Sequence, residues 1–248
     1  MQSAWRTVVQ VRVGRGSVFQ ITVREQVIDL ALEQPELSPR ELAVTFIDTR
    51  GYFISEASVY RLMKAQDLFA TPACRVMTAA DEFTDKTTAV NQLWQTDFTY
   101  LKVIGWGWFY LSTILDDYSH YVIAWKLCKT MKARDVTDTR TRGLDRRPRH
   151  RPHSRRAVAP DEQGKIERWH QTLKNRTLLE HYYLPGDLMA QVEAFVEYYN
   201  HRRYHESLAN LTPTDVYFGR GQSILNRRQR IKHKTIELRR LQRGRAAA

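Results

Sequence analysis

Two carboxylates and one lysine stand out because of where they fall in the local sequence pattern. Asp97 lies in the middle of "LWQTDFTYLKV", whose alternating side chains predict a strand, and aspartate is disfavoured inside strands. Glu167 and Lys174 lie seven residues apart in "EQGKIERWHQTLKNRTLLE", so helical spacing puts them on one face. Two carboxylates and a lysine placed in this way could take part in catalysis. From the residues alone, Asp97 also fits a solvated position on an open face, and Glu167 with Lys174 fits an ordinary surface ion pair.

The segments that would position these residues predict a three-strand meander and two helices. "FYLSTILDD" and "YVIAWKL" follow as strands joined by a turn at "DYSH", where Asp116 and Asp117 are expected to be structural. The helix around Glu167 has an inward stripe of Ile166, Trp169, His170, Leu173 and Thr177. A second helix carries Leu188, Val192, Phe195, Val196 and Tyr199 inward.

Three short helices are predicted nearer the N-terminus. In "ITVREQVIDLALEQ" the apolar residues share one face, and "SPRELAVTF" opens with Ser38 as N-cap and Glu41 closing a capping box. Ser55 caps the third helix, "EASVYRLMKAQ", which turns Arg61 and Lys64 outward. This pattern fits either a helix-turn-helix or a generic three-helix bundle.

The charge of the chain points toward nucleic acid. The net charge is +12 over 248 residues, and the segment 139–160, "TRTRGLDRRPRHRPHSRRAVAP", supplies eight arginines against one aspartate. The rest of the chain is therefore only mildly basic. Cys74 and Cys128 lie far apart, without the spacing of a zinc site or a disulfide framework, and no segment is apolar enough for a signal peptide or a membrane span. We expect a cytoplasmic, nucleoid-associated protein with no membrane partner.

Taken in order along the chain, these motifs resemble a known family. The three helices, then "WQTDFTYL", "FYLSTILDDYSHYVIAWKL", "GKIERWHQTLKN" and "YYNHRRYHESLANLTPTDVYFGR", are similar to the OrfB-type transposases of bacterial insertion sequences. The resemblance covers residues 20–138 and 163–235. It implies an α/β fold, an incomplete ribonuclease H-like integrase core, preceded by an all-α helix-turn-helix domain.

The resemblance also implies a domain order. Residues 1–20 are unassigned, 21–70 form the helix-turn-helix DNA-binding domain, and 71–90 form a linker. Residues 91–218 form the catalytic core, interrupted by a disordered Arg/Pro-rich segment at 139–160, and 219–248 form a basic C-terminal helix or tail.

The site that the family implies is a set of three carboxylates around two Mg²⁺ ions. Asp97 would bridge both ions and Glu167 would hold one. Lys174 would contact DNA near the reacting end, and the other DNA-contacting residues would be Arg61, Lys64, Arg202 and Arg203. The implied partner is double-stranded DNA, both transposon ends and target, bound by a homo-oligomer.

The remaining carboxylate of that set is missing from its expected place. The family carries an aspartate in a context like "SDNG" at the end of a fourth strand, but here that place is taken by the segment 139–160. A frameshifted or internally deleted copy explains this, and a genuine basic arm is the alternative. Three hypotheses follow: a transposase that binds DNA without cutting it, a retained DNA-binding module that competes for transposon ends, or an active enzyme with a substitute ligand among Asp135, Asp138 and Asp145.

Overall fold

The computed structural model describes residues 18–68, 87–132, 164–177 and 184–247, and the chain divides into two compact units. One unit combines Met1–Met77 with Asn226–Ala248, and the other is Thr78–Leu225. Each unit has a hydrophobic core of its own. The Arg/Pro-rich segment 139–160 and most of the expected linker 71–90 lie outside the described residues.

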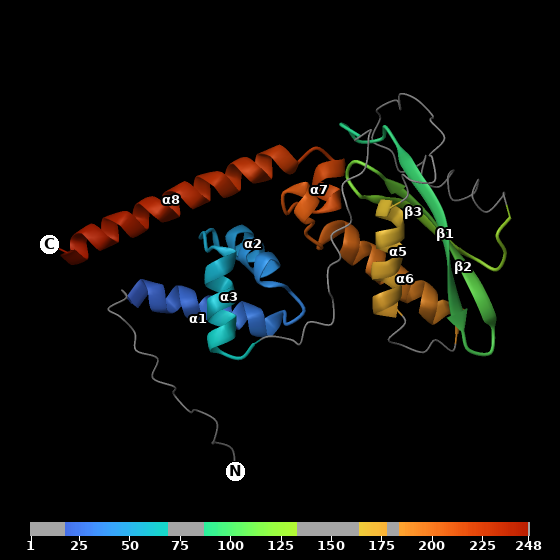
Figure 1. Ribbon diagram of the computed structural model, residues 1–248, viewed down its shortest axis with the longest axis horizontal. Coiled ribbons are helices and arrows are strands. Elements are labelled where there is room, and N and C mark those ends of the chain that lie inside the picture. Colours follow the sequence, from blue (N-terminus) through green and yellow to red (C-terminus); the bar gives the residue numbers. More distant parts are fainter. Residues whose placement is uncertain (1–17, 69–86, 133–163, 178–183, 248) are drawn as a thin grey trace, which may run out of the picture. The chain divides into compact units, whose positions relative to one another are not determined.

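Three helices build the core of the first unit: α1 (Val18–Glu33), α2 (Pro39–Arg50) and α3 (Glu56–Ala65) (Figure 1). The capping box is present, because Ser38 Oγ accepts from the Glu41 N–H while the Glu41 carboxylate accepts from the Ser38 N–H at 3.0 Å. Helix α2 ends at Gly51, whose φ of 62° is the left-handed conformation that glycine adopts readily. Of the apolar side chains expected on the inner faces, Val23, Val27, Leu30, Ala31, Val59 and Met63 are buried, whereas Leu62 is only partly buried. The three helices and their caps are therefore confirmed.

The C-terminal helix α8 (Gly221–Ala247) contributes its residues from Asn226 onward to the same unit. The Thr235 hydroxyl is buried and accepts from the Phe53 N–H at 3.1 Å. Arg239 donates to the Tyr52 hydroxyl at 2.9 Å and to the Phe53 carbonyl at 2.7 Å. This basic helix thus packs by polar contacts against the connection between α2 and α3.

The second unit contains a three-stranded antiparallel sheet in the order β1-β2-β3. Its strands are β1 (Trp94–Val103), β2 (Gly107–Asp116) and β3 (Val122–Cys128), so the predicted meander is confirmed. The register pairs Asp97 with Thr113 and Thr113 with Trp125. Within the described residues β1 pairs with β2 alone, so Asp97 lies on an edge strand of the described sheet.

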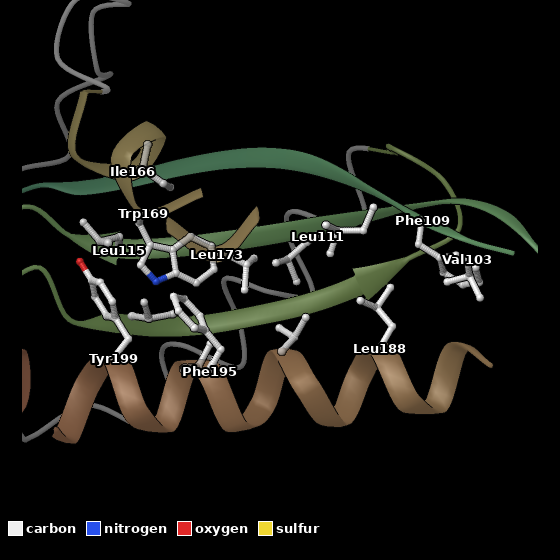
Figure 2. Packing of buried hydrophobic residues seen from close by; sticks show 14 residues of the cluster. Val103, Phe109, Leu111, Leu115, Ile166, Trp169, Leu173, Leu188, Phe195 and Tyr199 are labelled. Atoms are coloured by element: carbon white, nitrogen blue, oxygen red, sulfur yellow. The ribbon is translucent and has the colours of Figure 1, made fainter. Parts of the chain in front are cut away.

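Two helices, α5 (Gly164–Thr177) and α6 (Pro185–His201), pack on one face of this sheet. Figure 2 shows Trp169 and Leu173 of α5 with Phe195 and Leu188 of α6 against strand residues such as Leu111. The predicted inward stripes are confirmed at Ile166, Trp169, His170 and Leu173 of α5 and at Leu188, Val192, Phe195, Val196 and Tyr199 of α6. The side chain of Thr177, also expected in the α5 stripe, lies outside the described part of the chain. The second unit is thus a mixed α/β structure.

A short C-terminal part of this unit completes the fold. A 3₁₀ turn (Glu206–Leu208) leads to helix α7 (Pro213–Tyr217), whose N-cap Thr212 accepts from the Asp215 N–H. Tyr217 is buried in a separate cluster with Ile114 and Ile123, and its ring stacks on Tyr121. Helix α7 therefore anchors the end of the unit to β2 and β3.

Candidate active site

Asp97 meets His170 between β1 and α5. Asp97 Oδ2 lies 3.2 Å from His170 Nδ1, and its Oδ1 accepts from the Phe98 N–H at 2.7 Å. The far ring nitrogen of His170 lies 3.4 Å from the Thr113 hydroxyl on β2. His170 is buried while the Asp97 side chain is 33% exposed. The carboxylate is thus oriented by the fold and still reaches solvent.

Residues spaced along α5 contact residues spaced along β1 in the same order. The Ile166 N–H donates to Gln95 Oε1 at 3.0 Å, His170 meets Asp97 one turn later, and Lys174 Nζ lies 4.3 Å from the centre of the Tyr100 ring. The helix and the strand therefore run parallel where they are in contact. Glu167 is exposed and lies one turn before His170, between the contacts made by Ile166 and His170.

The pKa of Asp97 is lowered below its ordinary value. Burial alone would raise it, but the hydrogen bond from His170 and the Phe98 N–H, together with the positive charges of His170 and Lys174, favour the ionised form more strongly. Asp97 is therefore a carboxylate at neutral pH.

A buried polar cluster fixes the start of α5 against the sheet. Asp117 Oδ1 accepts from the Gln95 amide at 2.7 Å, while its Oδ2 accepts from Lys165 at 2.9 Å and from the Thr87 hydroxyl at 2.6 Å. Lys165 also donates to the Asp117 carbonyl at 2.9 Å. The sequence pattern did not single out Gln95, and no local signal pointed to its partner Ile166, which lies 71 residues further along the chain.

The neighbouring Asp116 closes the β2–β3 turn from inside the fold. Its carboxylate accepts from the Asn91 N–H at 2.7 Å and from both the N–H and the hydroxyl of Ser119 at 2.9 and 2.6 Å. Burial raises its pKa and the Asp117 charge adds to this, whereas the Ser119 and Asn91 hydrogen bonds act in the opposite direction. The structural role expected for Asp116 and Asp117 is confirmed by these contacts.

The motif "YYNHRRYHESLANLTPTDVYFGR" also holds the fold together. Asn200 accepts from the Val122 N–H at 2.9 Å and donates to the Val122 carbonyl at 3.1 Å, so it binds the β3 backbone as another strand would. The Tyr217 hydroxyl donates to Asn91 Oδ1 at 3.1 Å. Arg202 is exposed just after α6, while the Arg203 guanidinium lies 5.7 Å from the centre of the Tyr199 ring.

Two partly buried histidines lie beside this motif. His120 and His205 are in edge-to-face contact at 5.5 Å, and His205 also packs against Tyr199 at 4.9 Å. Burial lowers the pKa of each histidine to about 3, and nearby cationic groups add to the shift. Both rings are therefore neutral at physiological pH.

The described residues do not fit a two-metal centre. They contain no group of three His, Cys, Asp or Glu side chains placed to hold one ion. Asp97 contacts His170, and Asp116 and Asp117 are engaged within the fold. The alternative ligands, Asp135, Asp138 and Asp145, lie outside the described residues.

The second unit also contains a cavity of about 840 Å³. Lys165, Arg168 and His120 line one part of it, and Leu211, Val216 and Leu225 line another. Neither Asp97 nor Glu167 contributes to the lining. This cavity is therefore distinct from the Asp97 site.

In the first unit, the expected DNA-contacting residues lie on the surface of α3. Arg61 Nε donates to the Ala57 carbonyl at 3.1 Å, and its Nη2 lies 3.4 Å from the Ser58 hydroxyl, so both contacts stay within the helix. Lys64 is exposed one turn further on. At the start of α3, Glu56 forms an ion pair with Arg40 at 3.3 Å.

Comparison with known proteins bears on the second unit. Two sequence families, both described as Integrase core domain, match the chain, one over residues 87–176 and the other over residues 149–213. No curated protein matches it. No helix in the described ranges is long and apolar enough to cross a membrane.

The first match includes both β1, with Asp97, and α5, with Glu167 and Lys174, and the second includes α5. Integrase core domains act on DNA and generally depend on divalent metal ions. The mixed α/β unit, with its three-stranded antiparallel sheet, is consistent with the ribonuclease H-like fold of such a core. The matches support an integrase or transposase family, and a function of that general kind, for this chain.

Proposed function

We propose that this chain is an OrfB-type insertion-sequence transposase that binds double-stranded DNA but has lost strand transfer. The pairing of β1 with α5 carries the proposal, because Asp97 lies against the helix that bears Glu167 and Lys174. These are the positions at which the resemblance puts two catalytic carboxylates and a DNA-contacting lysine. The low pKa of Asp97 suits a group that works as an anion.

Duplex binding is assigned to the helix-turn-helix at 21–70, with α3 as the recognition helix. Arg61 and Lys64 project from its surface, and neither forms an ion pair with a described carboxylate. Helix α8 adds exposed cations to the same unit at Arg230, Lys234, Arg240 and Arg243. Such cations release counterions from DNA phosphates, so we expect affinity to fall steeply with salt.

Loss of strand transfer follows from the number of carboxylates. In-line attack at phosphorus uses a metal pair about 3.5 to 4 Å apart, which needs more ligands than two separate carboxylates supply. The aspartate that completes the family's set has no counterpart at its expected place, where the sequence has the segment 139–160. Catalytic groups that act as a unit fail together when one is absent.

A gel-shift titration with transposon-end duplex tests the DNA-binding part of the proposal. Arg61→Ala with Lys64→Ala should weaken binding by about 1 to 3 kcal/mol for each base contact, and by less where the contact is to phosphate. Arg24→Ala with Arg50→Ala removes the same charge from exposed positions on α1 and α2 and serves as the matched control. Equal affinities for the two double variants would reject α3 as the recognition helix.

A second candidate function is that of a retained DNA-binding module. The observation in its favour is that α1 to α3 form a core of their own, to which α8 is attached by polar contacts, without any candidate catalytic residue. In that case the chain would inhibit strand transfer by an intact transposase of the same element, and the Arg61→Ala/Lys64→Ala variant would not. Absence of inhibition at saturating chain concentration would exclude this role.

A further inference from the structure

Large aromatic side chains are exposed at the β1–β2 hairpin. Tyr100 is 59% exposed, Trp106 is 56% exposed and Trp108 is 53% exposed, whereas Trp169 in the core is 1% exposed. The rings of Tyr100 and Trp108 are in edge-to-face contact at 5.4 Å. Exposed apolar groups that gather in one place are a common sign of a binding surface.

The turn of this hairpin holds Trp106 out toward solvent. Gly105 and Gly107 flank it with φ values of 82° and 87°, a region that residues with a side chain rarely adopt. Nothing lies within 4 Å of a Cβ added to either glycine. The two glycines are therefore needed for the backbone of the turn, and Trp106 is presented at its tip.

Each exposed ring is accompanied by a lysine. Lys102 Nζ lies 5.8 Å from the centre of the Trp108 ring, Lys129 Nζ lies 5.8 Å from that of Trp106, and Lys174 Nζ lies 4.3 Å from that of Tyr100. In the described part of the chain, none of these three lysines forms an ion pair with a carboxylate. Residues 98–110 and 126–132 contain no Asp or Glu. We name the six residues Tyr100, Lys102, Trp106, Trp108, Lys129 and Lys174 the hairpin surface.

We propose that the hairpin surface binds unpaired DNA nucleotides adjacent to Asp97. Exposed rings stack with bases, and lysines between them neutralise phosphates, which is how proteins hold single strands without reading sequence. A duplex offers its phosphates but keeps its base faces stacked, so exposed tryptophans favour the unpaired form. This inference rests on the proposed function, which supplies DNA as the ligand.

The location of the surface links it to the candidate active site. Tyr100 lies three residues after Asp97 on β1, about 10 Å along the strand at 3.3 to 3.4 Å per residue. Lys174 contacts Tyr100 and also acts electrostatically on Asp97. Side chains three residues apart leave opposite faces of a strand, so a single strand of DNA held on the hairpin surface would reach the Asp97 carboxylate by passing Lys174 beside β1.

Fluorescence anisotropy with the full chain and a labelled oligothymidylate of about 15 nucleotides tests the inference. Trp106→Ala with Trp108→Ala should weaken binding at least about tenfold, since stacking contributes about 1 to 3 kcal/mol per base. The control is Met189→Ala, which removes a comparably exposed apolar side chain from α6 in the same unit. It should bind like the wild type.

The same proteins are then titrated with transposon-end duplex. We expect the tryptophan variant to keep its duplex affinity, and the Arg61→Ala/Lys64→Ala variant to lose duplex affinity while keeping its affinity for the oligothymidylate. Oligothymidylate binding that is unchanged in the tryptophan variant overturns the inference, whatever the duplex result. Failure of duplex binding alone counts against the proposed function and not against the hairpin surface.

Size-exclusion chromatography separates this inference from an interface between two copies of the chain. A change of oligomeric state in the tryptophan variant, with unchanged oligothymidylate affinity, would assign the hairpin surface to self-association and overturn the proposal.

Lys102→Gln with Lys129→Gln should lower oligothymidylate affinity less than the tryptophan pair and should flatten the salt dependence of that affinity.

Discussion

Truncating Gln95 to alanine should destabilise the Thr78–Leu225 unit by about 3 kcal/mol. The side chain is fully buried, accepts from the Ile166 N–H at 3.0 Å and donates to Asp117 at 2.7 Å. A neutral hydrogen bond contributes about 1 kcal/mol and one to a charged group about 1.5 to 3 kcal/mol. Asp117 keeps Lys165 and Thr87 as donors, so the lower value applies, and the small cavity adds the remainder.

Urea unfolding followed by tryptophan fluorescence measures this change in the relevant unit. Five of the six tryptophans lie between residues 94 and 169, so the signal reports on the sheet and α5. With an m-value of about 1.5 kcal/mol/M, the midpoint should fall by about 2 M. Because the start of α5 loses its attachment to β1, the contact between His170 and Asp97 should loosen as well.

Gln171→Ala is the matched control for this variant. It removes an exposed amide from the same helix, whose hydrogen bond to Asn175 measures 2.8 Å. A surface contact of this kind contributes about 0.2 to 0.5 kcal/mol. If Gln95→Ala were as stable as this control, the idea that Gln95 attaches α5 to the strand carrying Asp97 would be wrong.

Three further changes have defined outcomes. Asn200→Ala should cost about 2 to 3 kcal/mol in the same urea assay, because it leaves a buried N–H and a buried carbonyl of β3 unpaired; a loss below about 1 kcal/mol would contradict this. His170→Ala should raise the pKa of Asp97, measured by carboxyl-carbon NMR titration, since it removes a hydrogen bond and a positive charge; an unchanged pKa would refute the pairing. In the folded protein His120 and His205 have pKa values of about 3, so below pH 6.5 each takes up a proton on unfolding. The free energy of unfolding should therefore be highest above pH 6.5 and should fall as the pH is lowered toward 3. At pH 5 the loss should be up to about 2 kcal/mol per histidine. His120→Asn, which tolerates the left-handed φ of 60° at this position, should reduce the slope between pH 7 and pH 5, and an unchanged slope would contradict the assignment.

Local patterns sufficed to predict most secondary structure of the chain. The alternation in "LWQTDFTYLKV" gave β1, and apolar residues at helical spacing gave the buried faces of α5 and α6. The capping box at Ser38 and Glu41 was readable because both partners lie within one turn. These features depend on residues close together in the chain.

The contacts that position Asp97 could not be predicted in the same way. Gln95 and Ile166 are 71 residues apart, and Asn200 and Val122 are 78 apart, so nothing in the local pattern pairs them. His170 fitted an apolar stripe and was expected only to be buried, yet it also bonds to Asp97.

Helix α8 illustrates the same limit. Its composition fits a solvated basic tail as well as a packed helix, and polar contacts attach it to α2 and to the connection between α2 and α3. Asp48 pairs with Arg228 at 2.6 Å, and Phe53 with Thr235 at 3.1 Å, both across about 180 residues of sequence. Without an apolar stripe, hydrophobic periodicity carries no signal for such packing.

A strand-transfer assay with transposon-end DNA tests the central claim most directly. The full chain is incubated with labelled end duplex and Mg²⁺ or Mn²⁺, and bound DNA and reaction products are measured in the same samples. The proposed function predicts salt-sensitive duplex binding with no cleavage or joining product in either metal. A metal-dependent product that disappears in the Asp97→Asn variant would contradict it, and would direct the search for the third ligand to Asp135, Asp138 and Asp145.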